Sequence, residues 1–327
     1  MDTTATYDAC HTSLISCLRM VAEGCPDLSV DSPPLRRLRN LVQVLPTARA
    51  VRVIPKSPDL TLSQTLGLLS TSQETMAMLR SADTSGRVYE EMDQALSQTI
   101  ATLREAVGKA LRRKRVHRVR GLYVIIDPQV ANGRDPLELA ASAVRGGARM
   151  LQLRDKLGDK GTVLPLATRL QQLCRDNDVD LIINDHADLA TVVGSAGLHL
   201  GQTDFPVAQA RRVLSPEQVL GRSNHEIDEL VQSQKMGADH VAFGAIYATG
   251  TKGVGRPPQG VARLRDARGA TQLPLVAIGG INAENVGPVV EAGADAICVT
   301  AAVGLAENPE AAASRLVEAI RDAGGRV

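Results

Sequence analysis

Two cations and an amide follow one short apolar run of the chain in close succession. Gln152, Arg154 and Lys156 occupy alternate positions in the segment 152–156. Alternate side chains of an extended strand point to the same face, so Gln152 and Arg154 face one side and Lys156 follows on the loop. This group could bind an anion, although the same residues would also suit a basic strand end that is paired with neighbouring acids.

Carboxylates follow the next two apolar runs. Asp185 comes directly after Asn184, and Asp204 follows the run at 197–200. On adjacent strands these two carboxylates could share one Mg²⁺ ion, because Mg²⁺ prefers oxygen ligands and is completed by phosphate oxygens and water. Capping of a following helix is the competing role for each aspartate.

A hydroxyl and an imidazole follow the fifth apolar run. Ser223 could donate a hydrogen bond to a phosphate oxygen, and His225 is a candidate general base. A histidine in this position is more often a hydrogen-bonded structural residue, and the sequence leaves that alternative open.

Glycines and hydroxyls define a second group of candidate anion contacts. The loop at 244–253 is rich in both and carries one lysine, so its backbone amides could wrap an anion while the lysine contacts it. It lacks the GxxxxGK[ST] pattern of a Walker loop. Glycines after the seventh run and a hydroxyl after the eighth allow close approach to a phosphate. The residues concerned are Thr249, Gly250, Thr251, Lys252, Gly279, Gly280 and Thr300.

All of these residues follow short apolar runs that predict β-strands, and each run is followed by a segment with helical spacing. Strands that are buried on both faces and joined by helices imply a parallel sheet. Eight such units predict a closed (β/α)8 TIM barrel, with an open doubly wound sheet as the alternative. The eight runs are Leu122–Asp127, Arg149–Leu153, Asp180–Asn184, Gly197–Leu200, Val219–Ser223, His240–Ile246, Leu273–Gly279 and Ala296–Thr300.

The helical spacing is clearest in five of the intervening segments, each with one apolar stripe. They are Pro136–Arg145, Thr162–Cys174, Ile227–Met236, Ala283–Ala292 and Pro309–Ile320. Because the carboxyl ends of barrel strands open onto one mouth, we expect the candidate residues to converge there. The mouth would then offer two anion sites, which suit a diphosphate and a monophosphate.

The amino-terminal part has a different pattern. Helical periodicity with few β-branched runs predicts a smaller, mostly helical domain at 1–111. A basic run at 112–120 is interpreted as a solvated helix end and linker, although it could also hold an anionic partner. The barrel domain is expected at 121–327. The predicted helices are Leu14–Ala22, Leu35–Val44, Leu60–Leu69, Ser72–Arg80 and Tyr89–Leu111.

Composition narrows the classes of function. The chain has 327 residues, 44% of them hydrophobic, which is enough for two packed domains. With no Trp, two Phe and four Tyr, an aromatic platform for nucleic acid is disfavoured. Five cysteines without a CxxC pair, no signal-like amino terminus and no long apolar run predict a cytoplasmic protein that spans no membrane. The sequence does not define the oligomeric state, and a homo-oligomer is one alternative.

Six motifs in this order resemble the thiamine-phosphate synthase family, which joins the pyrimidine and thiazole halves of thiamine. They are QLRDK at 152–156, NDHADLA at 184–190, GLHLGQTD at 197–204, GRSNH at 221–225, TGTKG at 249–253 and IGGI at 278–281. The resemblance covers Gly121 to about Asp322 and implies a TIM-barrel transferase.

The resemblance also implies roles for individual residues. Hydroxymethylpyrimidine diphosphate would be bound by Gln152, Arg154, Asp155, Lys156, Asn184, Ser223 and Lys252, and Mg²⁺ by Asp185 and Asp204. Thiazole phosphate would be bound by Thr249, Gly250, Thr251, Gly280, Val299 and Thr300. Position 300 is usually serine in the family, and threonine keeps the hydroxyl. Arg154, Lys156, Ser223 and Lys252 would be the catalytic residues.

In the family's reaction, diphosphate leaves the pyrimidine methylene group and the thiazole nitrogen attacks the resulting cation. No protein nucleophile is needed, which agrees with the absence of a nucleophile elbow from the sequence. Two alternatives remain: a thiazole tautomerase on the same barrel, and a non-catalytic phosphate-sensing barrel.

The amino-terminal 120 residues faintly resemble a helical domain that some bacteria fuse ahead of this synthase and that is associated with pyrimidine-phosphate kinase activity. The matching segments are Leu18–Val21, Met78–Arg80 and Lys56–Thr61, and the last of these lacks the turn glycine. We therefore expect a structural or oligomerising domain, or a kinase that has lost its activity.

Overall fold

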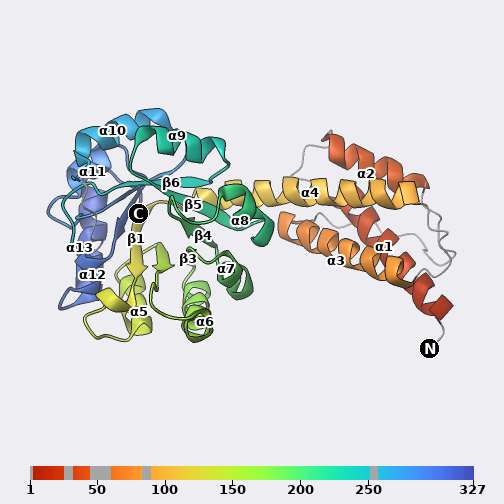
Figure 1. Cartoon of the computed structure of the whole chain (residues 1–327), viewed down its shortest axis with the longest axis horizontal. Helices are drawn as coiled ribbons and strands as arrows, with labels where there is room; N and C mark the ends of the chain where they lie inside the picture. Colours follow the sequence, from red (N-terminus) through yellow and green to blue (C-terminus); the bar gives the residue numbers. More distant parts are fainter. Residues whose placement is uncertain (1–2, 26–31, 45–59, 83–89, 251–256) are drawn as a thin grey trace. The chain divides into compact units, whose positions relative to one another are not determined.

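The computed structural model describes residues 3–25, 32–44, 60–82, 90–250 and 257–327. The chain forms two compact units, residues 1–111 and 112–327. The first is helical and the second is a closed barrel (Figure 1). The fold class expected from the sequence is confirmed.

Four helices make up the described part of the amino-terminal unit. They are α1 (Thr3–Gly24), α2 (Pro33–Val44), α3 (Leu62–Ala82) and α4 (Glu90–Val116), which continues past the unit boundary. Leucine, isoleucine and valine side chains at helical spacing form the core, with Leu18, Leu35, Leu69 and Leu103 fully buried. The mostly helical domain expected here is therefore present.

Helix α3 corrects one expectation, because Leu60–Leu69 and Ser72–Arg80 are a single helix rather than two. In the structure the hydroxyls of Ser70, Ser72 and Thr75 each donate to the carbonyl four residues earlier, at 2.8–3.0 Å. These bonds satisfy the side chains without interrupting the helix.

Eight parallel strands close into a barrel in sequence order, with β1 paired to β8. Each strand agrees with one of the eight predicted runs to within one or two residues. The strands are β1 (Gly121–Ile126), β2 (Met150–Leu153), β3 (Asp180–Asn184), β4 (Gly197–Leu200), β5 (Val219–Asn224), β6 (His240–Gly244), β7 (Leu275–Ile278) and β8 (Ala296–Val299).

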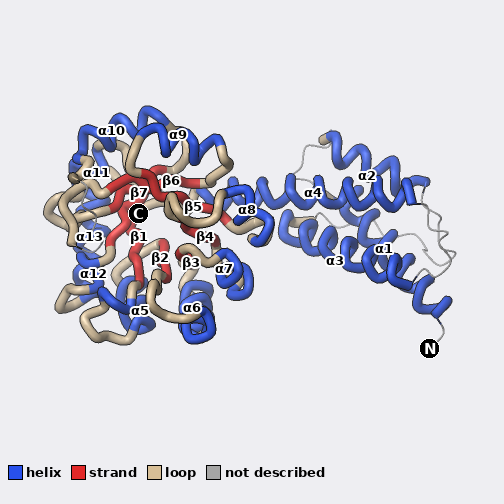
Figure 2. The backbone as a smooth tube through the Cα atoms, viewed as in Figure 1, coloured by secondary structure: helices blue, strands red, loops and turns tan. Residues whose placement is uncertain are grey.

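Helices surround the strands and cover their outward faces (Figure 2). Besides the 3₁₀ turn η1 (Pro128–Val130), they are α5 (Pro136–Arg145), α6 (Lys160–Asp176), α7 (Ala187–Val193), α8 (Val207–Val213), α9 (Ile227–Lys235), α10 (Gly260–Ala270), α11 (Gly287–Glu291), α12 (Ala301–Gly304) and α13 (Pro309–Asp322).

The predicted helix at Ala283–Ala292 is shorter in the structure. Helix α11 begins only at Gly287, because the Asn282 side chain accepts hydrogen bonds from the backbone of Glu284 and Asn285 and forms a turn. Pro288 then occupies the first helical turn, where its missing N–H costs nothing.

Strand alternation divides the apolar residues into two groups. One set points outward against the helices, and the other fills the barrel interior. The interior set includes Tyr123, Ile125, Met150, Ile182 and Cys298. The interior is therefore packed at mid-height, so ligands can be accommodated only towards its ends.

Arginines of the basic run pair with carboxylates at the amino-terminal end of the barrel. Arg112, in the last turns of α4, is 7% exposed, and its Nε lies 3.4 Å from Asp239. The Arg118 guanidinium contacts Asp180 at 3.1 Å and Asp178 at 3.0 Å. Val119 is buried inside the barrel. Part of this run is thus packed against the barrel rather than solvated.

None of the helices in the described part of the chain is long and apolar enough to cross a membrane.

Candidate active site

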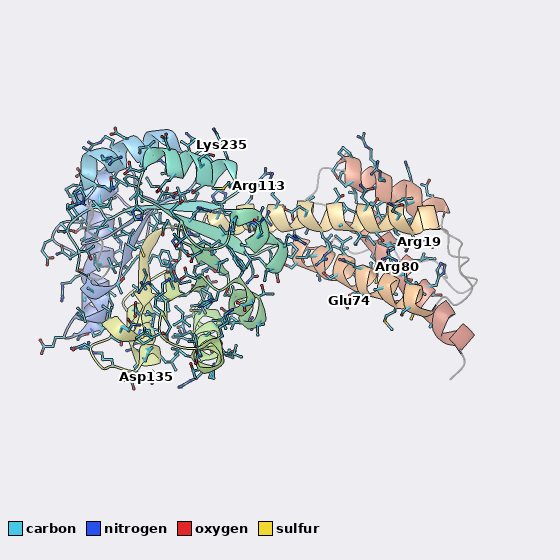
Figure 3. All side chains as sticks on the ribbon, in the orientation of Figure 1. Arg19, Glu74, Arg80, Arg113, Asp135 and Lys235 are labelled. Carbon is cyan, nitrogen blue, oxygen red and sulfur yellow. The ribbon has the colours of Figure 1, made fainter. Side chains whose placement is uncertain are left out.

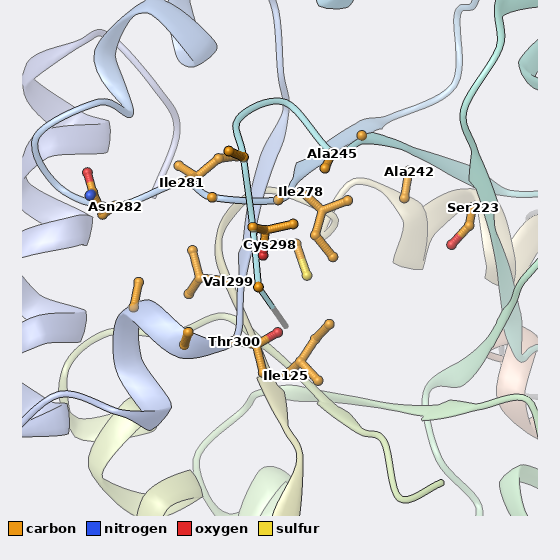
Figure 4. A pocket seen from close by; sticks show the side chains of 18 of the residues that line it. Ile125, Ser223, Ala242, Ala245, Ile278, Ile281, Asn282, Cys298, Val299 and Thr300 are labelled. Atoms are coloured by element: carbon orange, nitrogen blue, oxygen red, sulfur yellow. The ribbon is translucent and has the colours of Figure 1, made fainter. Parts of the chain in front are cut away.

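A cavity of about 420 Å³ opens at the carboxyl ends of the strands. Residues from strands β1, β5, β6, β7 and β8 and from the loops that follow the strands line it (Figure 4). Polar side chains that border it include Asp127, Arg154, Ser223 and Thr300. Active sites of parallel barrels lie at this end, so the cavity is the candidate active site.

The floor of the cavity is apolar. Ile125, Ala242, Ile278 and Cys298, one each from β1, β6, β7 and β8, line it with side chains of the barrel interior (Figure 4). These are interior positions of their strands, which alternation predicts. An apolar floor below polar walls suits flat organic rings that carry charged groups.

An ion pair between Arg154 and Asp127 forms part of the cavity wall. The Arg154 guanidinium contacts the Asp127 carboxylate, and Asp127 is almost completely buried. The residues come from neighbouring strands, because β1 pairs with β2 in the register Ile126↔Leu153. A buried carboxylate needs a compensating cation, so this pair fixes the position of the arginine.

On the loops that follow β2, β3 and β4, the structure brings Lys156, Asp185 and Asp204 together. The Lys156 ammonium contacts the Asp185 carboxylate, and Asp204 is the acidic neighbour of Asp185. Burial, together with the Asp204 carboxylate, raises the pKa of Asp185, and Lys156 opposes the shift. Two neighbouring carboxylates repel each other, and a cation relieves that repulsion.

The chemistry of this carboxylate pair fits Mg²⁺. The Asp185 backbone is left-handed at φ 63°, a conformation that aspartate tolerates better than most residues, and it follows directly on β3. Asp204 is held by a hydrogen bond of 2.6 Å from the Gly201 N–H. No cluster of three or more His, Cys, Asp or Glu ligands occurs in the described residues. Two carboxylates are nevertheless enough for Mg²⁺ when a phosphorylated ligand supplies the rest.

The wall formed by β5 carries Ser223. Its hydroxyl lies 2.8 Å from Nε2 of His199, an inward-facing residue of β4. The Ser223 backbone carbonyl accepts a hydrogen bond from Gln202, close to Asp204 in the sequence. His225 bonds through Nδ1 to the Gly244 carbonyl at 2.7 Å, which agrees with the structural interpretation of this residue.

Glycine is required at the corner formed by β6 and β7. Gly279 and Gly280 have φ of 102° and 67°, and a Cβ on Gly280 would lie 2.4 Å from the Ala248 carbonyl oxygen. The backbone of 279–280 therefore packs directly on the loop after β6. Thr249, Gly250, Val299 and Thr300 line the cavity together with these glycines.

The remaining predicted site residues that the structure describes do not line the cavity. Gln152 faces the barrel interior but below the cavity, where its Nε2 donates to the Tyr123 hydroxyl at 2.6 Å. Burial raises the pKa of Tyr123, so the hydroxyl stays protonated. Asp155 accepts from the backbone N–H groups of Leu157 and Gly158 in a local turn. Asn184 ends β3, next to Asp185. Thr251 and Lys252 lie outside the described residues.

Sequence reasoning missed two polar residues of this region. The sequence analysis named Asp127 only as the last residue of the first run. Its pairing with Arg154 follows from the register of β1 with β2, which makes Ile126 and Leu153 neighbours. His199 has an interior position by alternation, but its contact with Ser223 depends on the pairing of β4 with β5. The available signal was a polar residue at an inward-facing strand position.

A closed parallel barrel whose mouth holds cations, carboxylates, hydroxyls and glycine backbone is typical of enzymes that act on phosphorylated small molecules. A family model described as thiamine monophosphate synthase matches residues 122–303.

Two curated relatives and one solved structure agree with this match. The thiamine-phosphate synthase of Shouchella clausii is 39% identical over 202 residues, which are 62% of this chain and 97% of that protein. The thiamine-phosphate synthase of Synechococcus sp. (strain WH7803) is 36% identical over 248 residues, 71% of this chain and 70% of that protein. The structure of thiamine phosphate pyrophosphorylase from Pyrococcus furiosus is 30% identical, with a TM-score of 0.59, and covers 64% of this chain and 99% of that one.

The chain therefore belongs to the thiamine monophosphate synthase family, which confirms the resemblance seen in the sequence, and it is a transferase of thiamine biosynthesis. The Synechococcus match is longer than residues 121–327, so it extends into the residues that precede the barrel.

Proposed function

We propose that the barrel couples hydroxymethylpyrimidine diphosphate to thiazole phosphate and releases diphosphate and thiamine phosphate. The observation that carries this proposal is one cavity of about 420 Å³ that is lined by Arg154, Ser223, Gly280 and Thr300 together. Two anionic groups attached to flat rings would find a cation, hydroxyls and glycine backbone around it.

The diphosphate side is the one with the cations. Arg154, Lys156 and Lys252 would stabilise the negative charge that builds up on the leaving diphosphate, with a hydrogen bond from Ser223. Each well-placed donor of this kind contributes about 3 kcal/mol to transition-state stabilisation. Gln152, Asp155 and Asn184 complete the proposed set of diphosphate-binding residues. The hydrogen bond from Gln152 to the Tyr123 hydroxyl would hold Gln152 in place.

Asp185 and Asp204 would hold Mg²⁺ beside the diphosphate. When bound, the ion would supply positive charge to the diphosphate oxygens. The support from this chain is that the two carboxylates are neighbours and that the pKa of Asp185 is raised by burial and by Asp204.

Thiazole phosphate would lie at the glycine corner. Its phosphate would receive backbone N–H groups and hydroxyls from Thr249, Gly250, Thr251, Gly280, Val299 and Thr300. Glycines with positive φ allow the backbone to approach an anion closely, which supports this location.

The reaction needs no protein nucleophile. The bond between the pyrimidine methylene carbon and the diphosphate oxygen breaks, and the electron pair leaves with diphosphate. The thiazole ring nitrogen then donates its lone pair to the methylene carbon. The role of the protein is to hold the two rings in contact, neutralise the leaving group and keep water from the cation.

Mixing the purified chain with both heterocyclic substrates and Mg²⁺ tests the proposal. We expect diphosphate release that depends on thiazole phosphate. Release without thiazole phosphate would indicate a hydrolase, and no release in either mixture would contradict the proposal. Arg154→Ala should abolish coupling and leave the binding of thiazole phosphate largely intact, because Arg154 belongs to the diphosphate side.

For the helical unit we propose a structural or oligomerising role, or a kinase that has lost its activity. Residues 56–59 of the suspected kinase motif lie outside the described residues. Because the turn glycine is missing from that motif, the full chain should fail to phosphorylate hydroxymethylpyrimidine phosphate with ATP, and sustained turnover in that assay would overturn this proposal. We further propose that the enzyme acts in the cytoplasm on small molecules, without nucleic-acid or membrane partners.

A further inference from the structure

Asp127 makes two different contacts with its two carboxylate oxygens. Oδ1 accepts a hydrogen bond of 3.0 Å from the Gln129 N–H and caps the 3₁₀ turn η1. Oδ2 contacts Nη1 of Arg154. The side chain is only 1% exposed, so the chain around it fixes its position.

The electrostatics make Arg154 the counterion of Asp127. Removing a carboxylate from water costs several kcal/mol unless a cation and hydrogen bonds replace the water. Among the described residues, Arg154 forms the one ion pair recorded for Asp127, and Asp127 the one for Arg154. The arginine side chain is 17% exposed and borders the cavity, as does Asp127.

The geometry leaves part of the guanidinium available. Arginine has five N–H donors in a rigid planar fork, and Asp127 engages Nη1. With one edge held, the other donors stay at the cavity wall. Without Asp127 the long side chain would regain its rotamers, and binding an anion would then cost the entropy of ordering it again.

We propose that Asp127 is a positioning residue, which presents the Arg154 guanidinium to the diphosphate group in the cavity. The inference deepens the proposed function and rests on it for the identity of the anion. Asp127 itself would not touch the substrate.

Asp135 supplies a matched control within the same chain. Like Asp127 it precedes a proline, and its side chain caps a helical segment by accepting from the Leu137 N–H at 2.8 Å. It lies on the surface of the barrel unit (Figure 3) and has no arginine partner in the described residues. Asp135→Asn therefore changes the same kind of cap without affecting the cavity.

The first test is the binding of inorganic diphosphate with Mg²⁺ to the full chain, measured by calorimetry. Asp127→Asn keeps an oxygen for the Gln129 N–H but loses the charge that holds Arg154. We expect its dissociation constant for diphosphate to rise at least fivefold and that of Asp135→Asn to equal wild type. Unchanged or tighter binding by Asp127→Asn would overturn the inference, since tighter binding is the result if Asp127 merely repels the anion.

A double-mutant cycle separates positioning from general structural damage. In the Arg154→Ala background, Asp127→Asn should change diphosphate binding by less than twofold, because the group it positions is gone. A fivefold loss in both backgrounds would overturn the inference. If Asp127→Asn does not fold, Asp127→Ser retains a cap without the charge and replaces it throughout.

Coupling kinetics then distinguish this inference from the proposed function. With wild-type coupling present, Asp127→Asn should lower kcat at least tenfold and leave KM for thiazole phosphate within twofold. A kcat within twofold of wild type would contradict the positioning role of Asp127 and leave the proposed function unaffected. Absence of coupling in wild type contradicts the proposed function, while the binding cycle still tests whether Asp127 acts through Arg154.

Discussion

Charged residues gather at both ends of the barrel, but they are arranged differently. At the amino-terminal end, Asp239 is contacted by Arg112 and Arg211, and Asp295 by Arg268 and Arg326. The carboxylates there also accept backbone hydrogen bonds, as Asp239 does from the Leu220 N–H at 2.8 Å. These charges bind strands and helices to one another.

At the carboxyl-terminal end, Arg154 pairs with Asp127 and both residues line the cavity, while Lys156 pairs with Asp185 on the loops that follow β2 and β3. The comparison teaches that the number of charges does not distinguish a catalytic end from a structural one. The distinguishing feature is whether a cation, once paired, still faces space that a ligand could fill.

The largest expected effect follows from removing a cation at the cavity end. Lys156→Ala should lower kcat for coupling by about 100- to 1,000-fold, because the leaving diphosphate loses one stabilising charge. The Lys156 side chain is about half exposed, so the midpoint of thermal unfolding should hardly change. Steady-state kinetics and calorimetric melting together check this. A large loss of stability with little loss of rate would mean that both ends of the barrel serve structure.

The opposite result is expected at the amino-terminal end. Asp239→Asn should lower the free energy of unfolding by about 3 kcal/mol, because it removes the negative charge that Arg112 and Arg211 both contact in a largely buried position. Denaturant titration measures this loss. The rate of coupling, assayed well below the melting temperature, should remain near wild type, and a rate loss comparable to that of Lys156→Ala would break the comparison.

A buried histidine near the amino-terminal end should give the barrel a pH-dependent stability. Burial lowers the pKa of His240 to about 4, so the folded state keeps this residue neutral while the unfolded chain takes up a proton below about pH 6.5. The unfolded state thus binds more protons in the window from pH 6.5 to 4, and stability falls as pH falls through it.

For His240 alone, this linkage amounts to about 1.5 kcal/mol between pH 6.5 and pH 5. Urea titrations of wild type and His240→Gln at both pH values measure it. The variant should lose less stability on acidification by about that amount. Equal losses would show that His240 does not cause the acid sensitivity.

The smallest expected effect concerns the glycine corner. Thr300→Ser keeps the hydroxyl that lines the cavity, so KM for thiazole phosphate should change less than threefold. Thr300→Val removes the hydroxyl and should raise this KM about tenfold, as expected for a lost hydrogen bond to a charged group. Equal KM values in the two variants would exclude a contact between the hydroxyl and the phosphate.

The sequence predicted the barrel well because the same short pattern repeats. Strands buried on both faces are continuous apolar runs, and several helices end at a glycine before the next strand, as at Gly147, Gly237 and Gly293, which all have positive φ. The candidate residues were found because the strand ends of a parallel barrel share one mouth.

The contacts among those residues could not be predicted in the same way. Pairing of Asp127 with Arg154, and of Ser223 with His199, depends on the register between neighbouring strands, which alternation within one strand does not define. Alternation predicted that Gln152 and Arg154 share one face of their strand, but the depth of Gln152 in the barrel depends on Tyr123, to which it donates a hydrogen bond. The roles of these residues in the reaction stay predictions.

The central claim is that one cavity holds two anionic groups at the same time. Calorimetric titration of thiazole phosphate into the full chain, saturated beforehand with Mg²⁺ and inorganic diphosphate, tests it most directly. The account predicts one thiazole phosphate bound per chain while diphosphate stays in place. Displacement of diphosphate by thiazole phosphate would show a single shared anion site and contradict the account.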